Sequence, residues 1–192
     1  MPEYTNVEHQ DQLWKEGMYD YTEGVVSVKF DMCKFFIERE VKKPYRILDV
    51  GAGMSRIFPL LHNNIELYYY NDISQYVMYR FKDKNKELLC EFSKSKSLIF
   101  NAKRIENIIP ELCKCNFNVI LVLGAMPETH SKELVDKLLK IINNGILILD
   151  HNEMYDKYYD LGNKSQVKYQ VSDWVWDPPA YSRIMQVMKN GT

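Results

Sequence analysis

The stretch Ile47-Leu48-Asp49-Val50-Gly51-Ala52-Gly53 decides the fold class of this chain. Its apolar positions predict a short buried strand over residues 46–50, and this strand runs into a turn that holds two glycines. Such a turn lets the backbone approach a ligand closely, and open sheets of parallel strands bind ligands at the carboxyl ends of their strands. The stretch therefore predicts a ligand site directly after the first strand.

The chain beyond this turn alternates between strands and helices. We expect further strands at residues 66–70, 97–100, 117–123 and 145–150, and helices at residues 74–93, 104–113 and 131–142. Apolar, β-branched strands that alternate with helices predict a mostly parallel sheet with helices on both faces. Residues 7–41, before the first strand, predict two helices that break near residues 17–24.

The end of the chain has a different pattern. Two extended segments, at residues 166–177 and 181–189, are joined by Pro178-Pro179-Ala180. A connection this short cannot hold a crossover helix, so we expect the two segments to be antiparallel.

The composition is that of a globular protein of one domain. The chain has 192 residues, of which 46% are hydrophobic, so it can bury a core without disulfides or a structural metal. Its 25 basic and 26 acidic residues give a net charge of −1, which predicts no broad basic surface, although a local one fits within that balance. We expect free thiols at all four cysteines, Cys33, Cys90, Cys113 and Cys115. Because we find neither a signal-peptide pattern nor an apolar run of roughly 18 residues, we expect a cytoplasmic protein without a membrane partner.

Two acids accompany the glycine turn. Asp49 precedes the glycines at the strand end, where a carboxylate can hold an ammonium group. Arg56 stands where the dinucleotide fingerprint has its third glycine, which disfavours a bound pyrophosphate. Asp72 follows the next predicted strand, 23 residues after Asp49 (72 − 49), at the distance where an acid chelates a ribose diol.

With these features the chain resembles the class I S-adenosylmethionine-dependent methyltransferases. The matching segments are residues 47–53, 71–74, 117–123 and 145–150. The resemblance covers about residues 45–150 and implies a Rossmann-like α/β sheet of seven strands with an antiparallel last strand. It implies a single domain, residues 1–192, made of a short helical N-terminal cap (1–43), a cofactor-binding core (44–150) and a substrate-side segment with the closing hairpin (151–192).

The resemblance also implies S-adenosyl-L-methionine as cofactor and a set of residues that bind it. These residues are Asp49, Gly51, Gly53, Asp72, Ile73, Asn101, Ala102 and Leu123. Asn101 takes a position beside the adenine that is often acidic in the family, so its bond to the adenine amine would come through its amide carbonyl. The alternative is a different Rossmann-like protein, such as one that binds a nicotinamide cofactor.

The acceptor of the methyl group is predicted to be a small molecule. The segments outside the core are short and build a cap over a small molecule more easily than a groove for a polymer. Aromatic residues in these segments, together with polar residues after the fourth and fifth strands, are the predicted acceptor walls, namely Trp14, Tyr19, Tyr21, Glu128, Asn152, Tyr155 and Trp174. Their mixture favours O-methylation of a sugar or another polyhydroxylated metabolite. The near-neutral charge and the lack of a target-recognition domain disfavour a nucleic acid.

Three residues are candidates for the chemistry. A hydroxyl acceptor needs a base, and His130 and His151 follow the fourth and fifth predicted strands. Asp150 resembles the acid at the end of strand five in metal-dependent O-methyltransferases, which hold magnesium. Strand four ends here in Leu123-Gly124, without a second acidic ligand, so magnesium is not favoured and no metal ligand is predicted. The open alternatives are N-methylation of an amine, methylation of a nucleic acid, and a cofactor-binding subunit without chemistry.

Overall fold

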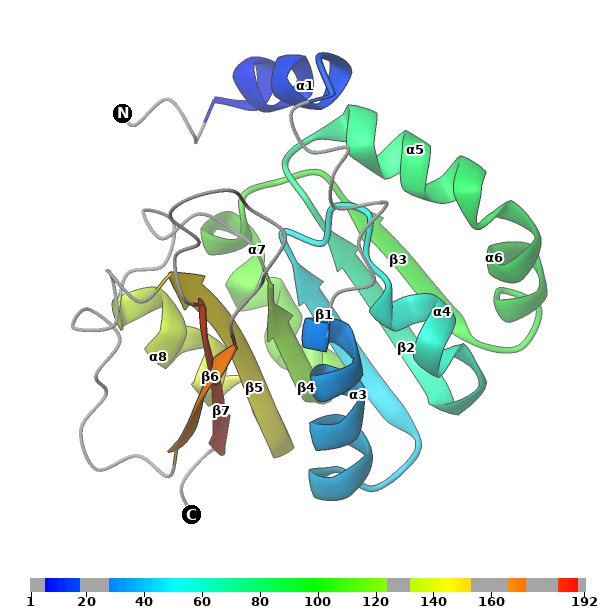
Figure 1. Cartoon of the computed structure of the whole chain (residues 1–192). Coiled ribbons are helices and arrows are strands. Elements are labelled where there is room, and N and C mark those ends of the chain that lie inside the picture. Colours follow the sequence, from blue (N-terminus) through cyan, green and yellow to red (C-terminus); the bar gives the residue numbers. More distant parts are fainter. Residues whose placement is uncertain (1–5, 18–27, 124–131, 153–165, 172–182, 190–192) are drawn as a thin grey trace.

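In the part of the chain that the structure describes, seven strands form one sheet in the order β3-β2-β1-β4-β5-β7-β6 (Figure 1). The computed structural model describes residues 6–17, 28–123, 132–152, 166–171 and 183–189. The strands are β1 (Tyr45–Val50), β2 (Ile65–Asn71), β3 (Ser97–Asn101), β4 (Phe117–Val122), β5 (Ile142–Asn152), β6 (Gln166–Val171) and β7 (Arg183–Lys189). The strands β1 to β5 pair in parallel, and β7 is antiparallel to both β5 and β6. The predicted fold class is confirmed, including the antiparallel last strand.

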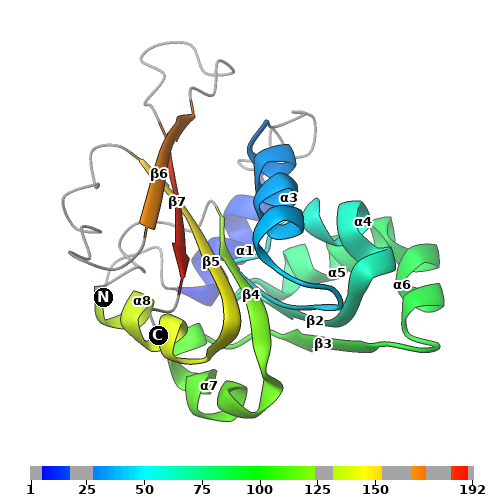
Figure 2. The same ribbon diagram turned by 90° about the horizontal axis from the view of Figure 1, so that it is seen from below.

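Helices cover both faces of this sheet (Figure 2). They are α1 (Val7–Lys15), α3 (Val28–Glu40), α4 (Ile57–Leu61), α5 (Gln75–Lys84), α6 (Lys86–Phe92), α7 (Ile105–Leu112) and α8 (Lys132–Lys140). Of these, α3 to α6 lie on one face and α7 and α8 on the other, while α1 lies beside α5 at the carboxyl edge of the sheet (Figure 1). No helix in the described ranges is both long and apolar enough to span a bilayer.

Two hydrophobic clusters, one on each face, hold the layers together. The tyrosines of β2 show how the strand supplies both, because successive side chains point to opposite faces. Tyr68 and Tyr70 pack beneath α4 and α5, where Tyr68 lies 4.8 Å from Phe58 and Tyr70 lies 4.9 Å from Phe81 between ring centroids. Tyr69 points to the other face and meets Phe117 edge to face at 6.0 Å.

The helices differ from the prediction in two places. The helix predicted over residues 74–93 is two helices, α5 and α6, because the Asn85 side chain donates to the Phe81 carbonyl oxygen at 2.9 Å and ends the first helix. The helix α4, which sequence periodicity did not predict, has only five residues and contains Pro59. All four cysteines are free thiols, as predicted.

β5 begins three residues earlier than predicted because it carries an irregularity opposite β4. Phe117 pairs with Ile142, but Val119 pairs with Ile146, so β5 holds two extra residues at this point. Asn144 adopts a left-handed backbone with φ 48° to accommodate them. The backbones approach so closely here that a Cβ on Gly145 would lie 1.8 Å from the carbonyl oxygen of Asn118.

Replacing Gly145 by Ala should therefore destabilise the protein strongly. The added methyl group meets backbone, which cannot move aside as a side chain can, and overpacking of this kind costs about 1–3 kcal/mol or more. The neighbouring change Asn144→Gly is the matched control, because glycine adopts a positive φ without strain and should stay within about 0.5 kcal/mol of the wild type. Chemical denaturation of both variants measures the difference, and equal stabilities would contradict this account of the irregularity.

Candidate active site

The glycine turn after β1 is held against the end of β2. Gly51 and Gly53 have φ values of 60° and 52°, in the left-handed region that glycine adopts without steric cost. The amide of Ala52 donates to the carbonyl oxygen of Asn71 at 3.1 Å, and the amide of Gly53 donates to Oδ2 of Asp72 at 2.9 Å. These two hydrogen bonds fix the turn beside the predicted ribose-binding acid.

The Asp72 carboxylate is buried at this junction, with 8% of the residue exposed. Its Oδ1 accepts a hydrogen bond from the amide of Ser74 at 2.9 Å, so each carboxylate oxygen holds one backbone N–H. The pKa of Asp72 is raised to about 6, mainly by burial and to a lesser extent by the charges of Asp49 and Asp11, although the two backbone hydrogen bonds oppose the shift. Because a carboxylate has about four acceptor positions, each oxygen retains one for a ligand.

The second acid, Asp49, lies at the end of β1 with 2% of the residue exposed. Its Oδ2 accepts from the hydroxyl groups of Ser55 at 2.6 Å and Tyr68 at 2.7 Å. Burial raises the pKa of Asp49 to about 6, although both hydrogen bonds oppose the shift. Within the described ranges no residue donates to its Oδ1, so this oxygen can accept from a ligand.

The end of β3 is tied to the end of β2 through Asn71 and Asn101. The Asn71 side chain donates to the carbonyl oxygens of Lys103 at 2.8 Å and Asn101 at 3.3 Å. The Asn101 side chain donates to the Tyr69 hydroxyl at 3.0 Å and accepts from the Lys103 amide at 2.8 Å. Its amide carbonyl therefore already holds one donor, and the predicted bond to an adenine amine would use its second lone pair.

The helix α1 lies over the glycine turn. Trp14 is buried, and a Cβ on Gly53 would lie 3.3 Å from Cζ2 of its indole. Oδ1 of Asp11 accepts from the Ser74 hydroxyl at 2.5 Å and from the Tyr76 amide at 3.3 Å. Asp11 thus fastens α1 to the start of α5, next to Asp72.

An ion pair lies at the end of β5. Nζ of Lys29, in the first turn of α3, lies 2.9 Å from Oδ2 of Asp150, and the two side chains are 16% and 2% exposed. Cys33 is buried close to this pair. Burial raises the pKa of the Cys33 thiol strongly, and the charge of Asp150 adds to the shift, so the thiol stays protonated.

Comparison with solved structures agrees with this fold. No protein-family model matches the chain, and no curated protein matches it. An rRNA methylase from Streptococcus thermophilus is 13% identical, with 87% of this chain and 99% of that chain covered and a TM-score of 0.65. A TehB-like SAM-dependent methyltransferase from Corynebacterium glutamicum is 9% identical, with 95% and 98% covered and a TM-score of 0.57. A Streptococcus mutans structure in complex with SAH is 13% identical, with 85% and 99% covered and a TM-score of 0.56.

The chain has the fold of the class I SAM-dependent methyltransferases. In this fold the junction of β1, β2 and β3 brings most of the predicted cofactor residues together at one edge. Ile73 and Ala102 follow β2 and β3 directly, and Leu123 follows β4, all partly buried. The roles of these residues remain predictions.

The predicted acceptor residues are spread differently. Trp14, expected in the acceptor wall, lies against the glycine turn. The backbones of His151 and Asn152 end β5, paired with Ile184 and Arg183 of β7. The remaining predicted residues lie outside the described ranges, and these are Tyr19, Tyr21, Glu128, His130, Tyr155 and Trp174.

Lys29 and Asp11 are among the site residues that the sequence analysis missed. Each meets its partner only through the tertiary fold, and no motif surrounds either residue. Within the ranges that the structure describes, no group of three or more His, Cys, Asp or Glu residues is arranged to hold a metal ion.

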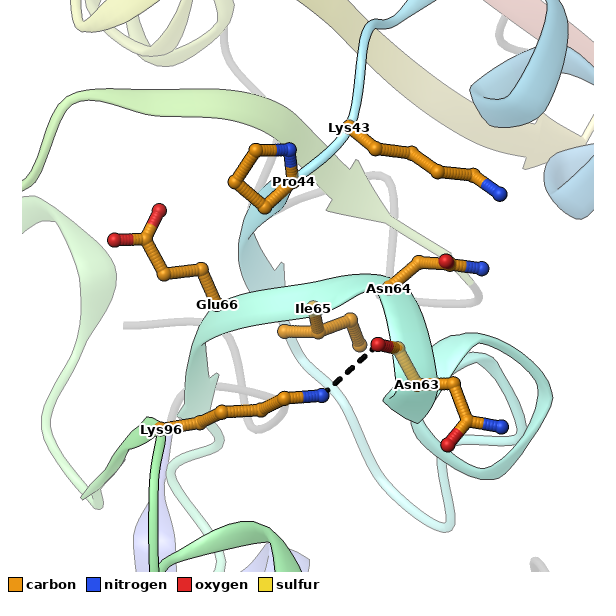
Figure 3. Close-up of a pocket in the computed structure, with 7 residues that line it drawn as sticks. All are labelled: Lys43, Pro44, Asn63, Asn64, Ile65, Glu66 and Lys96. Atoms are coloured by element: carbon orange, nitrogen blue, oxygen red, sulfur yellow. Dashed lines mark hydrogen bonds between the residues drawn. The ribbon is translucent and has the colours of Figure 1, made fainter.

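A surface pocket lies at the opposite edge of the sheet, at the amino ends of β1 and β2 (Figure 3). Its lining contains none of the predicted site residues and consists of Lys43, Pro44, Asn63, Asn64, Ile65, Glu66 and Lys96. Nζ of Lys96 donates to the carbonyl oxygens of His62 at 2.7 Å and Asn63 at 3.0 Å. Lys96 therefore ties the start of β3 to the segment before β2, and we assign this pocket no catalytic role.

Replacing Asp49 by Asn should stabilise the unliganded protein near neutral pH. Because burial raises the pKa of Asp49 from 3.8 to about 6, the folded state binds more protons than the unfolded state between these values. The penalty for the ionised carboxylate is complete above about pH 6 and is relieved as the pH falls toward 4. Asn removes the charge, and its carbonyl oxygen can accept both bonds that Oδ2 accepts. We expect a gain of up to about 3 kcal/mol near pH 7 and little gain near pH 4.

Chemical denaturation at the two pH values measures this difference. Glu66→Gln, which removes an exposed carboxylate, is the control and should change stability by less than about 0.5 kcal/mol at either pH. A stability of Asp49→Asn below that of the wild type at both pH values would contradict the assignment of a destabilising buried charge.

Proposed function

We propose that the protein is an enzyme that binds S-adenosylmethionine and transfers its methyl group to an acceptor. The observation that carries this proposal is the junction of β1 and β2, where a glycine turn and two buried acids, Asp49 and Asp72, meet at the carboxyl edge of the sheet. Ligands bind at this edge in open α/β sheets.

The Asp72 carboxylate fits a ribose diol. Each oxygen already accepts one backbone N–H, from Gly53 or Ser74, which fixes the orientation of the carboxylate. The remaining acceptor position on each oxygen can take one hydroxyl, so both hydroxyl groups of a ribose can be bound at once.

The charge of the site fits a cationic ligand. The negative charges of Asp49 and Asp11 both raise the energy of the ionised Asp72 carboxylate. A ligand with an ammonium and a sulfonium group reduces this repulsion, whereas a pyrophosphate increases it. This contrast supports adenosylmethionine over a nicotinamide dinucleotide.

Bound adenosylmethionine supplies an electrophilic methyl group. The residues of this chain orient it and keep water away. Asp72 and Asp49 hold the two ends of the cofactor, and Trp14 on α1 covers the glycine turn. Methyl transfer depends mainly on positioning the acceptor in line behind the sulfonium.

For the acceptor, a small molecule with a hydroxyl group is our first candidate. The candidate bases are His151 and His130, the two histidines that the sequence analysis predicted for this role. The ion pair of Lys29 and Asp150 supports a reaction that needs no metal ion, because an ammonium group already neutralises the acid at the end of β5.

A nucleic acid is the second candidate acceptor. The rRNA methylase from Streptococcus thermophilus is matched over 99% of its length by this chain. A domain of this size is therefore compatible with either acceptor, and its small size loses its weight as an argument against a nucleic acid.

Replacing Asp72 by Ala should weaken binding of adenosylhomocysteine at least about 10-fold, because two hydroxyl groups lose a charged acceptor. In the wild type, affinity should also fall as the pH drops through about 6, where Asp72 becomes protonated. Isothermal titration calorimetry measures both effects, and Asp83→Ala, an exposed acid on α5, is the control. The cofactor assignment fails if the wild type binds NAD but neither adenosylmethionine nor adenosylhomocysteine.

The ion pair yields a second prediction. Lys29→Met should cost about 3–5 kcal/mol near neutral pH, because it removes the ammonium group that pairs with the buried Asp150 carboxylate. The double variant Lys29→Met/Asp150→Asn should recover a large part of this loss. Thermal unfolding with and without millimolar Mn²⁺ provides the metal control. A metal-dependent stabilisation of the wild type that Asp150→Asn removes would mean that Asp150 is a metal ligand.

A further inference from the structure

We infer that the side of the molecule formed by α5 and β3 binds a single strand of nucleic acid. This inference rests on the second candidate acceptor. We call the surface the basic strip and define it by Lys15, Tyr76, Tyr79, Lys82, Phe100 and Lys103. Figure 1 shows the elements that carry it, with α1 beside the start of α5 and β3 at the edge of the sheet.

The net charge of the chain is near zero, but its basic and acidic residues are distributed unevenly along the sequence. Residues 80–104 contain eight basic and three acidic residues, which gives a local charge of +5. The remaining 17 basic and 23 acidic residues give −6. The positive charge is therefore concentrated on α5, α6 and the segments directly before and after β3, where it can attract a phosphate backbone.

Aromatic rings alternate with these cations. Nζ of Lys82 lies 4.1 Å from the ring centroid of Phe100 and 5.8 Å from that of Tyr79. Nζ of Lys15 lies 5.8 Å from the ring centroid of Tyr76. Tyr79 is 65% exposed, although a ring of this size is usually more deeply buried.

This combination has the chemistry of a single-strand binding surface. Such surfaces pair phosphates with Lys or Arg and stack unpaired bases on aromatic rings. Bases in a duplex are stacked on one another and do not offer their faces to protein rings, so the exposed Tyr79 favours a single strand.

The basic strip leads to the predicted cofactor site. Tyr76, in the first turn of α5, is four residues from Asp72. The Tyr76 amide donates to Asp11, which also accepts a hydrogen bond from the Ser74 hydroxyl. Lys103, at the end of β3, accepts a hydrogen bond from Asn71 through its carbonyl oxygen. A strand that lies along the basic strip therefore reaches the carboxyl edge, where the methyl donor is proposed to bind.

Binding of a fluorescein-labelled single-stranded RNA of about 15 nucleotides, measured by anisotropy without cofactor, tests the inference. We expect binding at about 50 mM salt that weakens steeply as salt rises. Lys82→Glu and Lys103→Glu should each reduce the slope of log affinity against log salt by about 1. Tyr79→Ala should weaken binding about 5-fold or more.

The matched controls lie on other surfaces. Lys137→Glu, on α8, makes the same charge change on the opposite face of the sheet, and Phe35→Ala removes an exposed ring on α3 that also carries a cation. Both should leave RNA affinity within about 2-fold of the wild type. Circular dichroism melting of each variant establishes that it is folded, and Lys103→Glu, at an exposed position, carries the test if Lys82→Glu does not fold.

The inference is overturned if the wild type does not bind the RNA at low salt, or if Lys137→Glu weakens binding as much as Lys103→Glu. It is also overturned if Tyr79→Ala does not change RNA affinity and heparin displaces the labelled RNA as effectively as unlabelled RNA does. The surface would then recognise charge alone. Calorimetry with adenosylhomocysteine on the same samples tests the cofactor assignment separately. A variant can lose RNA binding and still bind adenosylhomocysteine, or lose adenosylhomocysteine binding and still bind RNA.

Discussion

The hydrogen bond from the Gly53 amide to the Asp72 carboxylate is the contact on which the arrangement of the site depends. It joins the turn after β1 to the residue after β2, so the two ends of the predicted cofactor site move as one unit. The two glycines of the turn, Gly51 and Gly53, both adopt the left-handed conformation, which glycine takes without steric cost. The second backbone donor, from Ser74, also begins α5, and Asp11 uses the same serine to hold α1. The glycine turn, α5 and the cap helix are thus connected through one carboxylate.

This arrangement favours ligand binding over the stability of the unliganded protein. Asp49 and Asp72 are both buried and both have a raised pKa near 6. Apolar residues at these positions would avoid that cost but would leave backbone and hydroxyl donors unsatisfied. Buried acids with raised pKa values are typical of functional sites, where the ligand supplies the missing charge or donor.

The sequence predicted the parts of the fold that depend on local patterns. Apolar runs and glycine placement predict the strand positions, the turn, and the acids Asp49 near the end of β1 and Asp72 after β2. Parallel pairing then predicts that these features lie at one edge of the sheet. Local exceptions were not predictable. Asn85 divides a periodic helix with one side-chain bond, and the approach of Gly145 to Asn118 moves the start of β5. Lys29 was missed because its partner is 121 residues away. The charge asymmetry was present in the sequence, but only the fold shows which elements carry it.

The contact between Gly53 and Trp14 has a consequence for how this protein can change over evolutionary time. A Cβ at position 53 would lie 3.3 Å from Cζ2 of the indole, so the indole would have to shift by a few tenths of an ångström. The positive φ strains any side chain at position 53, and a larger side chain presses harder on Trp14, so we expect changes at the two positions to be coupled. Exchange of N-terminal segments between relatives of this fold should therefore succeed more often when positions 14 and 53 are transferred together.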